Sequence, residues 1–187
     1  MGPLSRVALA VGTLGLAAGI AAGPATASPA ATRSTTCTTD VWTAQRITTN
    51  FDVPAGATCR LGSGVEVTGN VTVEGELVSF GAQFDGNVSV NGGSLTAANQ
   101  GIYIGGNLSI TNSAGADGNN ATIQSTNGFA NDAGTSVIAG NFSYTYNSGR
   151  LYVGLNGGPT GTVVKGNFSY ANNTGPAPDL SGLTPTA

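Results

Sequence analysis

The chain has 187 residues and carries six Lys and Arg residues against nine Asp and Glu residues, a net charge of −3. This mild acidity argues against nucleic acid or anionic lipid as a partner, because both require a basic protein face. The chain contains no His, which excludes nucleophile–His catalysis and disfavours a zinc site. Its 30 Gly residues, with many Asn, Ser, Thr and Val residues, predict strands and tight turns rather than helices.

Residues 1–27 have the pattern of a cleavable secretory signal peptide. Met1 to Arg6 is short and positively charged, Val7 to Ala22 is apolar, and Ala25-Thr26-Ala27 provides the small-x-small cleavage pattern before Ser28. The apolar run is interrupted by glycines and is shorter than the roughly 20 residues of a spanning helix. We therefore expect a secreted, extracellular protein with no membrane insertion after signal removal.

The segment after the signal is predicted to hold a leader and a cap. Residues 28–36 are polar and are predicted to be disordered. Residues 37–48 are predicted to form an N-terminal cap over the first coil of the fold. Cys37 and Cys59 are the only two cysteines, and such a pair in an exported protein is expected to form a disulfide, here tying the cap to the fold.

A motif of Gly-Asn, an apolar residue, a hydroxyl residue and another apolar residue recurs along the chain. It occurs at Gly69–Val73, Gly86–Val90, Gly106–Ile110, Gly140–Tyr144 and Gly166–Tyr170, with a degenerate copy at Asn50–Val53. Subtracting the numbers of consecutive motif asparagines (50, 70, 87, 107, 141, 167) gives intervals of 20, 17, 20, 34 and 26 residues. Repeats in this range indicate a solenoid.

The residue types within the repeat indicate a β-solenoid. Apolar and polar residues alternate with period 2, which is typical of strands, and about 17–20 residues suffice for three short strands and their turns. Further strands are predicted at Leu77–Phe80, Leu95–Ala98, Ile102–Ile104, Leu151–Leu155 and Thr162–Val164. We predict an all-β fold over residues 49–170, a right-handed single-stranded parallel β-helix of about five or six coils. The variable intervals favour the right-handed form.

Two regions do not follow the repeat. Within residues 111–139, Asn120 to Ile123 fits the motif but lies too close to Asn107 for a full coil, so this region is predicted to be a looped-out insertion. Residues 171–187 contain Pro176, Pro178 and Pro185 and are predicted to be a tail that cannot pair.

The repeat assigns a role to each column of residues. The apolar residues are predicted to point inward, and the aromatic residues Phe142, Tyr144, Tyr146, Phe168 and Tyr170 to fill and close the core at the C-terminal end. The motif asparagines predict an asparagine ladder of Asn50, Asn70, Asn87, Asn107, Asn141 and Asn167. The outward hydroxyl residues form a possible binding stripe of Thr72, Ser89, Ser109, Ser143 and Ser169, continued by Asp52.

The stretch from Asn50 to Cys59, followed by Val67 to Val73, resembles a group of small secreted bacterial proteins of unassigned function. These proteins pair a Val-Pro-x-Gly-Ala-x-Cys segment with Gly-Asn-Val coils. The resemblance covers residues 37–110. More distantly, the coils resemble bactofilins and pectate-lyase-type β-helices, but the predicted signal peptide and disulfide distinguish the chain from bactofilins, and it is shorter than the lyases and lacks their basic catalytic residues. The resemblance implies a fold and a location rather than a reaction.

No residue pattern predicts catalysis, a cofactor or a metal. Glu74 and Glu76 could approach the spacing of a glycosidase pair, but Gly75 between them predicts a turn with both carboxylates in water. Asp117 begins a segment similar to a calcium-binding loop, yet Gly128 stands where a bidentate Glu is required. We therefore expect no catalytic, cofactor-binding or metal-ligating residue.

Two classes of function remain, with a third that fits less well. The first is a non-catalytic secreted structural or cell-surface protein that associates end to end with other copies. The second is an extracellular module that binds cell-envelope polysaccharide through the hydroxyl stripe, Tyr144 or Tyr170. A carbohydrate-active enzyme is the third, because such enzymes occur on β-helices.

Overall fold

The structure, a computed structural model, describes residues 33–97, 101–113, 119–126, 135–156 and 161–185. These residues form short strands joined by turns, and every strand pair is parallel, which confirms the predicted all-β class and parallel pairing. The described residues contain no helix that is long and apolar enough to cross a membrane. The predicted signal peptide and residues 28–32 lie outside the described part of the chain.

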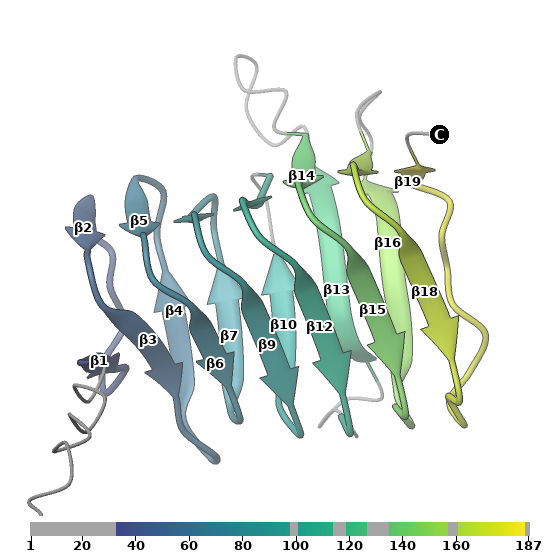
Figure 1. Cartoon of the computed structure of the whole chain (residues 1–187), viewed down its shortest axis with the longest axis horizontal. Coiled ribbons are helices and arrows are strands. Elements are labelled where there is room, and N and C mark those ends of the chain that lie inside the picture. The colour runs from purple at the N-terminus through teal and green to yellow at the C-terminus, as the bar shows by residue number, and fades with distance from the viewer. Residues whose placement is uncertain (1–32, 98–100, 114–118, 127–134, 157–160, 186–187) are drawn as a thin grey trace, which may run out of the picture. The chain divides into compact units, whose positions relative to one another are not determined.

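The strands belong to three parallel sheets (Figure 1). Sheet A contains β1 (Ser34–Thr36), β3 (Asn50–Val53), β6 (Val71–Val73), β9 (Val88–Asn91), β12 (Leu108–Thr111), β15 (Phe142–Thr145) and β18 (Phe168–Ala171). Sheet B contains β4 (Thr58–Leu61), β7 (Glu76–Ser79), β10 (Ser94–Ala97), β13 (Asn119–Thr126) and β16 (Arg150–Asn156). Sheet C contains β2 (Gln45–Ile47), β5 (Val65–Val67), β8 (Gln83–Phe84), β11 (Tyr103–Ile104), β14 (Ser136–Ile138), β17 (Thr162–Val164) and β19 (Leu183–Pro185).

Strands that follow one another in the sequence do not pair. From β3 to β17, successive strands fall in sheets A, B and C in turn, and each strand from β3 to β15 pairs with the strand three places further along the chain. Figure 1 shows the sheet A strands β3 to β18 side by side, with the sheet B strands β4 to β16 as a layer behind them. Each Gly-Asn motif supplies one sheet A strand, so the repeat in the sequence is the repeat of this sheet.

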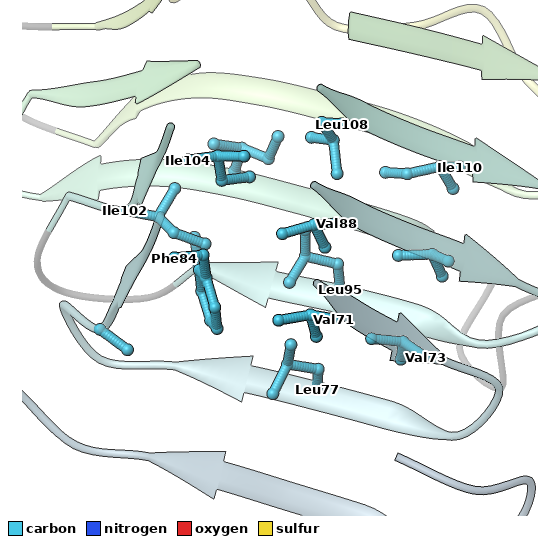
Figure 2. Packing of buried hydrophobic residues seen from close by; sticks show 14 of the residues in the cluster. Val71, Val73, Leu77, Phe84, Val88, Leu95, Ile102, Ile104, Leu108 and Ile110 are labelled. Atoms are coloured by element: carbon cyan, nitrogen blue, oxygen red, sulfur yellow. The ribbon is translucent and has the colours of Figure 1, made fainter. Parts of the chain in front are cut away.

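Inward side chains of the three sheets form one hydrophobic core. In sheet A, Val71 pairs in register with Val88 and Val88 with Leu108, and all three are 1% exposed. Full burial of a side chain of this size stabilises the fold by about 1.5–3 kcal/mol. Figure 2 shows the packing of three columns: Val71, Val88 and Leu108 from sheet A, Leu77 and Leu95 from sheet B, and Phe84 and Ile104 from sheet C.

The ordered fold extends beyond both predicted boundaries. Residues Ser34–Thr36, predicted to be disordered, form β1 and pair with β3. Residues Leu183–Pro185, predicted to lie in an unpaired tail, form β19 and pair with β17. Pro185 is tolerated there because β19 is an edge strand, where a missing backbone N–H need not break a ladder. Sheets A and C therefore each contain seven strands and sheet B contains five, against the five or six coils predicted.

The predicted cap also continues the sheets. Within residues 37–48, Val41 forms a parallel bridge with Leu61 of sheet B, and β2 pairs with β5 of sheet C. The backbone N–H of Val41 donates to the carbonyl of Arg60 at 2.8 Å. The chain thus adds one strand to sheet A (β1) and one to sheet C (β2) before the first motif. The described residues contain no strand that pairs with the outer edge of β1 or β2.

The predicted insertion at 111–139 was partly wrong. Residues Asn119–Thr126 form β13, which pairs with β10 on one side and β16 on the other. This segment is therefore the sheet B strand that follows β12, rather than a looped-out segment. Asn120 to Ile123 resembles the motif but belongs to sheet B. This explains why it follows Asn107 too closely to be the next sheet A strand.

Candidate functional site

The six motif asparagines lie at the start of successive sheet A strands and are joined by hydrogen bonds. The Oδ1 of each accepts the backbone N–H of the next, at 3.0, 3.0, 2.9, 2.8 and 2.8 Å from Asn50 to Asn167. Asn87 and Asn107 also donate from Nδ2 to the preceding Oδ1, both at 3.2 Å. The side chains thereby satisfy backbone donors at a corner where the sheet ladder begins.

A glycine precedes every motif asparagine except Asn50, and it is required by close approach between neighbouring turns. A Cβ on Gly86 would lie 2.4 Å from the carbonyl oxygen of Gly69, and one on Gly140 would lie 2.6 Å from Asn107 Oδ1. Any side chain at this position would push the turns apart and lengthen the asparagine hydrogen bonds. The Gly-Asn pair is therefore a single structural unit.

We predict that Asn141→Ala lowers the free energy of unfolding by about 1 kcal/mol, because the backbone N–H of Asn167 loses its acceptor at 2.8 Å. Asn167→Ala is the matched control, since the Asn167 side chain makes no hydrogen bond to described residues while its N–H keeps the same partner. Urea denaturation of both variants measures the difference. Equal destabilisation by the two substitutions would show that the ladder contributes nothing through Oδ1.

The hydroxyl residues form a second column on the outer face of sheet A. Asp52, Thr72, Ser89, Ser109, Ser143 and Ser169 are consecutive partners in register. Thr72, Ser89 and Ser169 are exposed, whereas Ser109 and Ser143 are half-buried. At one residue per strand, the column presents a hydroxyl group about every 4.8 Å.

A second set of asparagines, not predicted from the sequence, lies where the sheet A strands end. Asn147 is 1% exposed and accepts the backbone N–H of Ser113 at 2.9 Å on Oδ1. Its Nδ2 donates to the Ile110 carbonyl at 3.0 Å, and Asn173 Nδ2 donates likewise to Tyr144 at 2.9 Å. Both asparagines follow a ladder asparagine by six residues (147 − 141 and 173 − 167), a spacing that could have revealed them.

The residues directly before Asn147 and Asn173 adopt a left-handed backbone conformation, as do the equivalent residues after two other sheet A strands. Gly92, Asn112, Tyr146 and Asn172 occupy equivalent places after β9, β12, β15 and β18, with φ of 77°, 53°, 59° and 56°. Glycine and asparagine are the usual residues in this conformation, which costs a bulkier residue about 1 kcal/mol. Tyr146 is therefore the exception in the column, and its side chain is 64% exposed.

The C-terminal aromatic residues divide between core and surface. Phe142 and Tyr144 are fully buried, and the Tyr144 hydroxyl donates to the Gly149 carbonyl at 2.9 Å. Tyr170 is half-buried and its ring stacks on that of Tyr144, with centroids 5.6 Å apart. The prediction that Tyr146 fills the core was wrong, because the strand ends at Thr145 and the left-handed residue turns its side chain to solvent. A ligand contact by Tyr144 is excluded by its burial.

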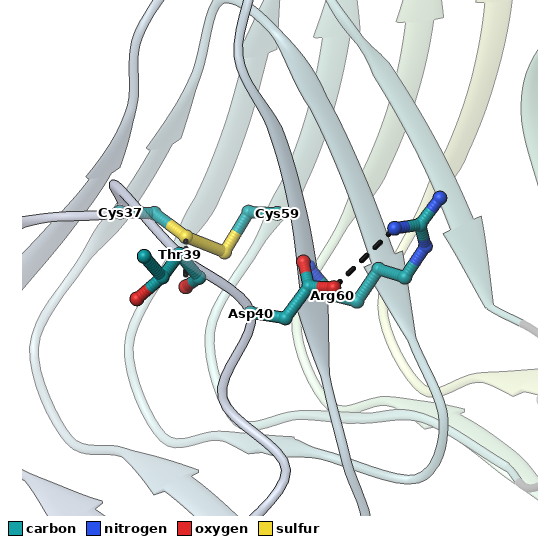
Figure 3. The surroundings of a disulfide bond; sticks show 5 residues. All are labelled: Cys37, Thr39, Asp40, Cys59 and Arg60. Carbon is teal, nitrogen blue, oxygen red and sulfur yellow. Dashed lines mark hydrogen bonds and ion pairs between the residues drawn. A yellow bond between two sulfur atoms is a disulfide. The ribbon is translucent and has the colours of Figure 1, made fainter.

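The predicted disulfide between Cys37 and Cys59 is present, and it joins the turn after β1 to the inner face of β4 (Figure 3). Beside it, Arg60 Nη1 lies 3.3 Å from Asp40 Oδ2, as Figure 3 also shows. Trp42 is 56% exposed and its ring lies 5.3 Å from that of Phe80.

A hollow of about 410 Å³ opens beside β1 and β2, lined mainly by threonines of residues 35–49 with Val41, Ile47 and Phe51. Val41 and Ile47 are half-buried. The hollow therefore combines polar walls with apolar side chains that the described residues only partly cover.

The acidic residues considered for catalysis are exposed. Glu74 and Glu76 border a hollow of about 230 Å³ whose lining includes four glycines, and Glu76 accepts a hydrogen bond from the Thr58 hydroxyl at 2.9 Å. The Ser181 backbone N–H donates to Asp179 at 3.1 Å and lowers the pKa of that carboxyl. In the described ranges, no three His, Cys, Asp or Glu residues gather as metal ligands, and Asp117 and Gly128 lie outside those ranges.

No family model, no curated protein and no solved structure matches this chain in comparisons with known proteins.

Proposed function

We propose that this chain is a secreted, non-catalytic structural or cell-surface protein folded as a right-handed single-stranded parallel β-helix that assembles end to end. The rotation of successive strands through sheets A, B and C supports the β-helix, since a coil of three strands produces that order. Export is supported by the signal-peptide pattern of residues 1–27 and by the disulfide, which persists in oxidising compartments. The resemblance of residues 37–110 to small secreted bacterial proteins agrees with this reading.

The observation that carries the assembly proposal is the pair of open strand edges. Among the described residues, β1 and β2 have no partner on one side, and neither do β18 and β19 at the other limit of sheets A and C. Exposed strand edges are templates for pairing with another chain. Because all strands are parallel, the first edge of one copy matches the last edge of another in direction.

Apolar side chains accompany both edges. Val41 and Ile47 line the hollow at the first edge, and Phe168, Tyr170 and Leu183 are partly buried hydrophobic residues on the last strands. Contact between two different surfaces of the same protein is heterologous, and it propagates into an open filament when the rotation does not close. Stacked copies would continue both the strand ladders and the core.

Leu183→Lys is expected to abolish assembly, whereas Thr184→Lys leaves it unchanged. The two residues are neighbours on β19, but Leu183 packs against the core and Thr184 is exposed. Sedimentation velocity over a concentration series, with electron microscopy of the mature protein, measures the association. Thermal unfolding verifies that both variants are folded. A wild-type protein that stays monomeric at its highest soluble concentration would exclude end-to-end assembly.

The hydroxyl column favours a second candidate function, binding of cell-envelope polysaccharide by the outer face of sheet A. Its six consecutive in-register side chains, from Asp52 to Ser169, form a regular row. Such a row can form hydrogen bonds with the hydroxyl groups of a polymer of repeating sugar units. Ser109→Lys should reduce retention in a pull-down on cell-wall polysaccharide. Thr96→Lys, on the outer face of sheet B, is the control that should retain binding.

A further inference from the structure

We propose that Tyr146, with Asn112 and Asn172 on either side, forms a subsite for one neutral hexopyranose residue of a polysaccharide. This inference rests on the second candidate function, which it makes specific, and it does not depend on end-to-end assembly. Tyr146 is a bulky aromatic residue in a left-handed backbone conformation that the equivalent positions fill with glycine or asparagine.

The backbone of Tyr146 indicates a role other than stability. At φ 59° it is held in the left-handed region, where a bulky side chain is unfavourable, and its neighbours in the column are Asn112 and Asn172. The side chain is 64% exposed, so the unfavourable backbone is not offset by burial. Strained, exposed residues of this kind are enriched at functional sites.

The flanking strands place two amide side chains beside the phenol ring. Thr145 pairs with Thr111 on one side and with Ala171 on the other. Asn112 and Asn172 directly follow these two partners, so their backbones lie about 4.8 Å from the backbone of Tyr146. The Tyr146 N–H donates to the Ala171 carbonyl at 3.3 Å, which holds this corner against the next strand.

Both amides have hydrogen-bonding capacity to offer a ligand. Asn112 donates from Nδ2 to Asn91 Oδ1 at 3.0 Å, which leaves its own Oδ1 as an acceptor. Asn172 is exposed and its side chain makes no hydrogen bond to described residues. An aromatic face between a hydrogen-bond acceptor and an amide suits a sugar ring, which presents apolar C–H groups on one face and hydroxyl groups around its edge.

The charge of the surroundings favours a neutral sugar. The three neighbouring corner segments, residues 109–113, 143–149 and 169–175, contain no Asp, Glu, Lys or Arg. The next charged residue along the chain is Arg150, and its Nε is occupied by the Ala177 carbonyl at 3.2 Å. A sulfated or uronic acid polymer would find no cationic partner in these segments, whereas a neutral hexose needs none.

The test compares Tyr146→Gly, Tyr146→Trp and Tyr103→Ala with the wild-type mature protein. Glycine removes the ring and relieves the left-handed backbone, tryptophan keeps an aromatic face, and Tyr103 is a 40% exposed tyrosine on sheet C, away from this corner. Binding to microcrystalline cellulose, chitin and starch granules is measured as a partition coefficient, and melting temperature is measured alongside.

We expect the wild type to bind at least one of these polymers, and Tyr146→Gly to lower that partition coefficient at least tenfold without lowering the melting temperature. Tyr146→Trp and Tyr103→Ala should bind within twofold of wild type. Absence of wild-type binding to all three polymers, or wild-type binding by Tyr146→Gly, overturns the subsite. If Ser109→Lys alone abolishes binding, the hydroxyl column is the binding face and only the Tyr146 subsite is wrong.

Discussion

Replacement of Gly86 by alanine is expected to lower the free energy of unfolding by about 3 kcal/mol. The added Cβ would lie 2.4 Å from the Gly69 carbonyl oxygen, 2.8 Å from its carbon and 3.0 Å from the Asn70 nitrogen. All three are backbone atoms, so no flexible side chain can move aside. Separating the two turns would also stretch the 3.0 Å hydrogen bond from the Asn87 N–H to Asn70 Oδ1.

Gly92→Ala is the matched control for this prediction. Gly92 lies in the next turn, has φ of 77°, and a Cβ built there meets no atom within 4 Å. Only the left-handed backbone opposes alanine at this position, with a cost of about 1 kcal/mol. Guanidinium denaturation of the two variants should therefore separate them by about 2 kcal/mol. A smaller effect at Gly86 than at Gly92 would mean that the turns are not packed as closely as the structure places them.

The sheet A strands could be predicted from sequence because one short pattern contains three physical requirements. The glycine permits close approach of turns, the asparagine supplies the corner acceptor, and the apolar pair alternates with an outward hydroxyl. At Gly106 to Ile110, for example, the motif matches the strand start, the register with β9 and the inward side chains. Each requirement acts between neighbouring strands and therefore repeats along the chain.

The ends of the fold could not be predicted in this way. Ser34–Thr36 has no apolar residue, and its three side chains are exposed, so no hydrophobic alternation marks the strand. It is held by backbone pairing with β3, and the Ser34 hydroxyl also donates to the Asp52 carboxylate. Pairing of this kind depends on an existing edge rather than on the segment's own residues.

The candidate binding residues were predicted only where the strand pattern continues. Tyr144, Thr145 and Tyr146 alternate as if both tyrosines pointed inward, yet the chain leaves the strand at Thr145. The left-handed backbone at Tyr146 turns this side chain to solvent, and the alternation of apolar and polar residues does not reveal the change. Comparison of equivalent positions in successive sheet A strands would reveal it, since Tyr146 aligns with Gly92, Asn112 and Asn172.

Loss of the disulfide is expected to destabilise the first turns of the fold by about 3 kcal/mol while leaving the later ones protected. Cys37 and Cys59 are 22 residues apart, and their link restricts the unfolded chain across β2 and β3. If the chain is a β-helix, its stability is roughly a sum of contacts between neighbouring coils, so damage at one limit remains local. Amide hydrogen exchange should therefore accelerate in residues 34–61 after reduction and change little beyond Asn87.

The Cys37→Ala, Cys59→Ala double variant should reproduce the effect of reduction, because it removes the link without placing a hydroxyl at Cys59, which is fully buried. Asp40→Asn is the control in the same segment: it weakens the exposed ion pair with Arg60 and should cost less than about 0.5 kcal/mol. Hydrogen exchange is a better reporter than Trp42 fluorescence, since that side chain is already 56% exposed in the folded protein. Even acceleration along the whole chain would indicate one cooperative unit and contradict the locality expected of stacked coils. Unchanged exchange near β1 and β4 would mean that strand pairing alone holds this end, with the disulfide adding nothing.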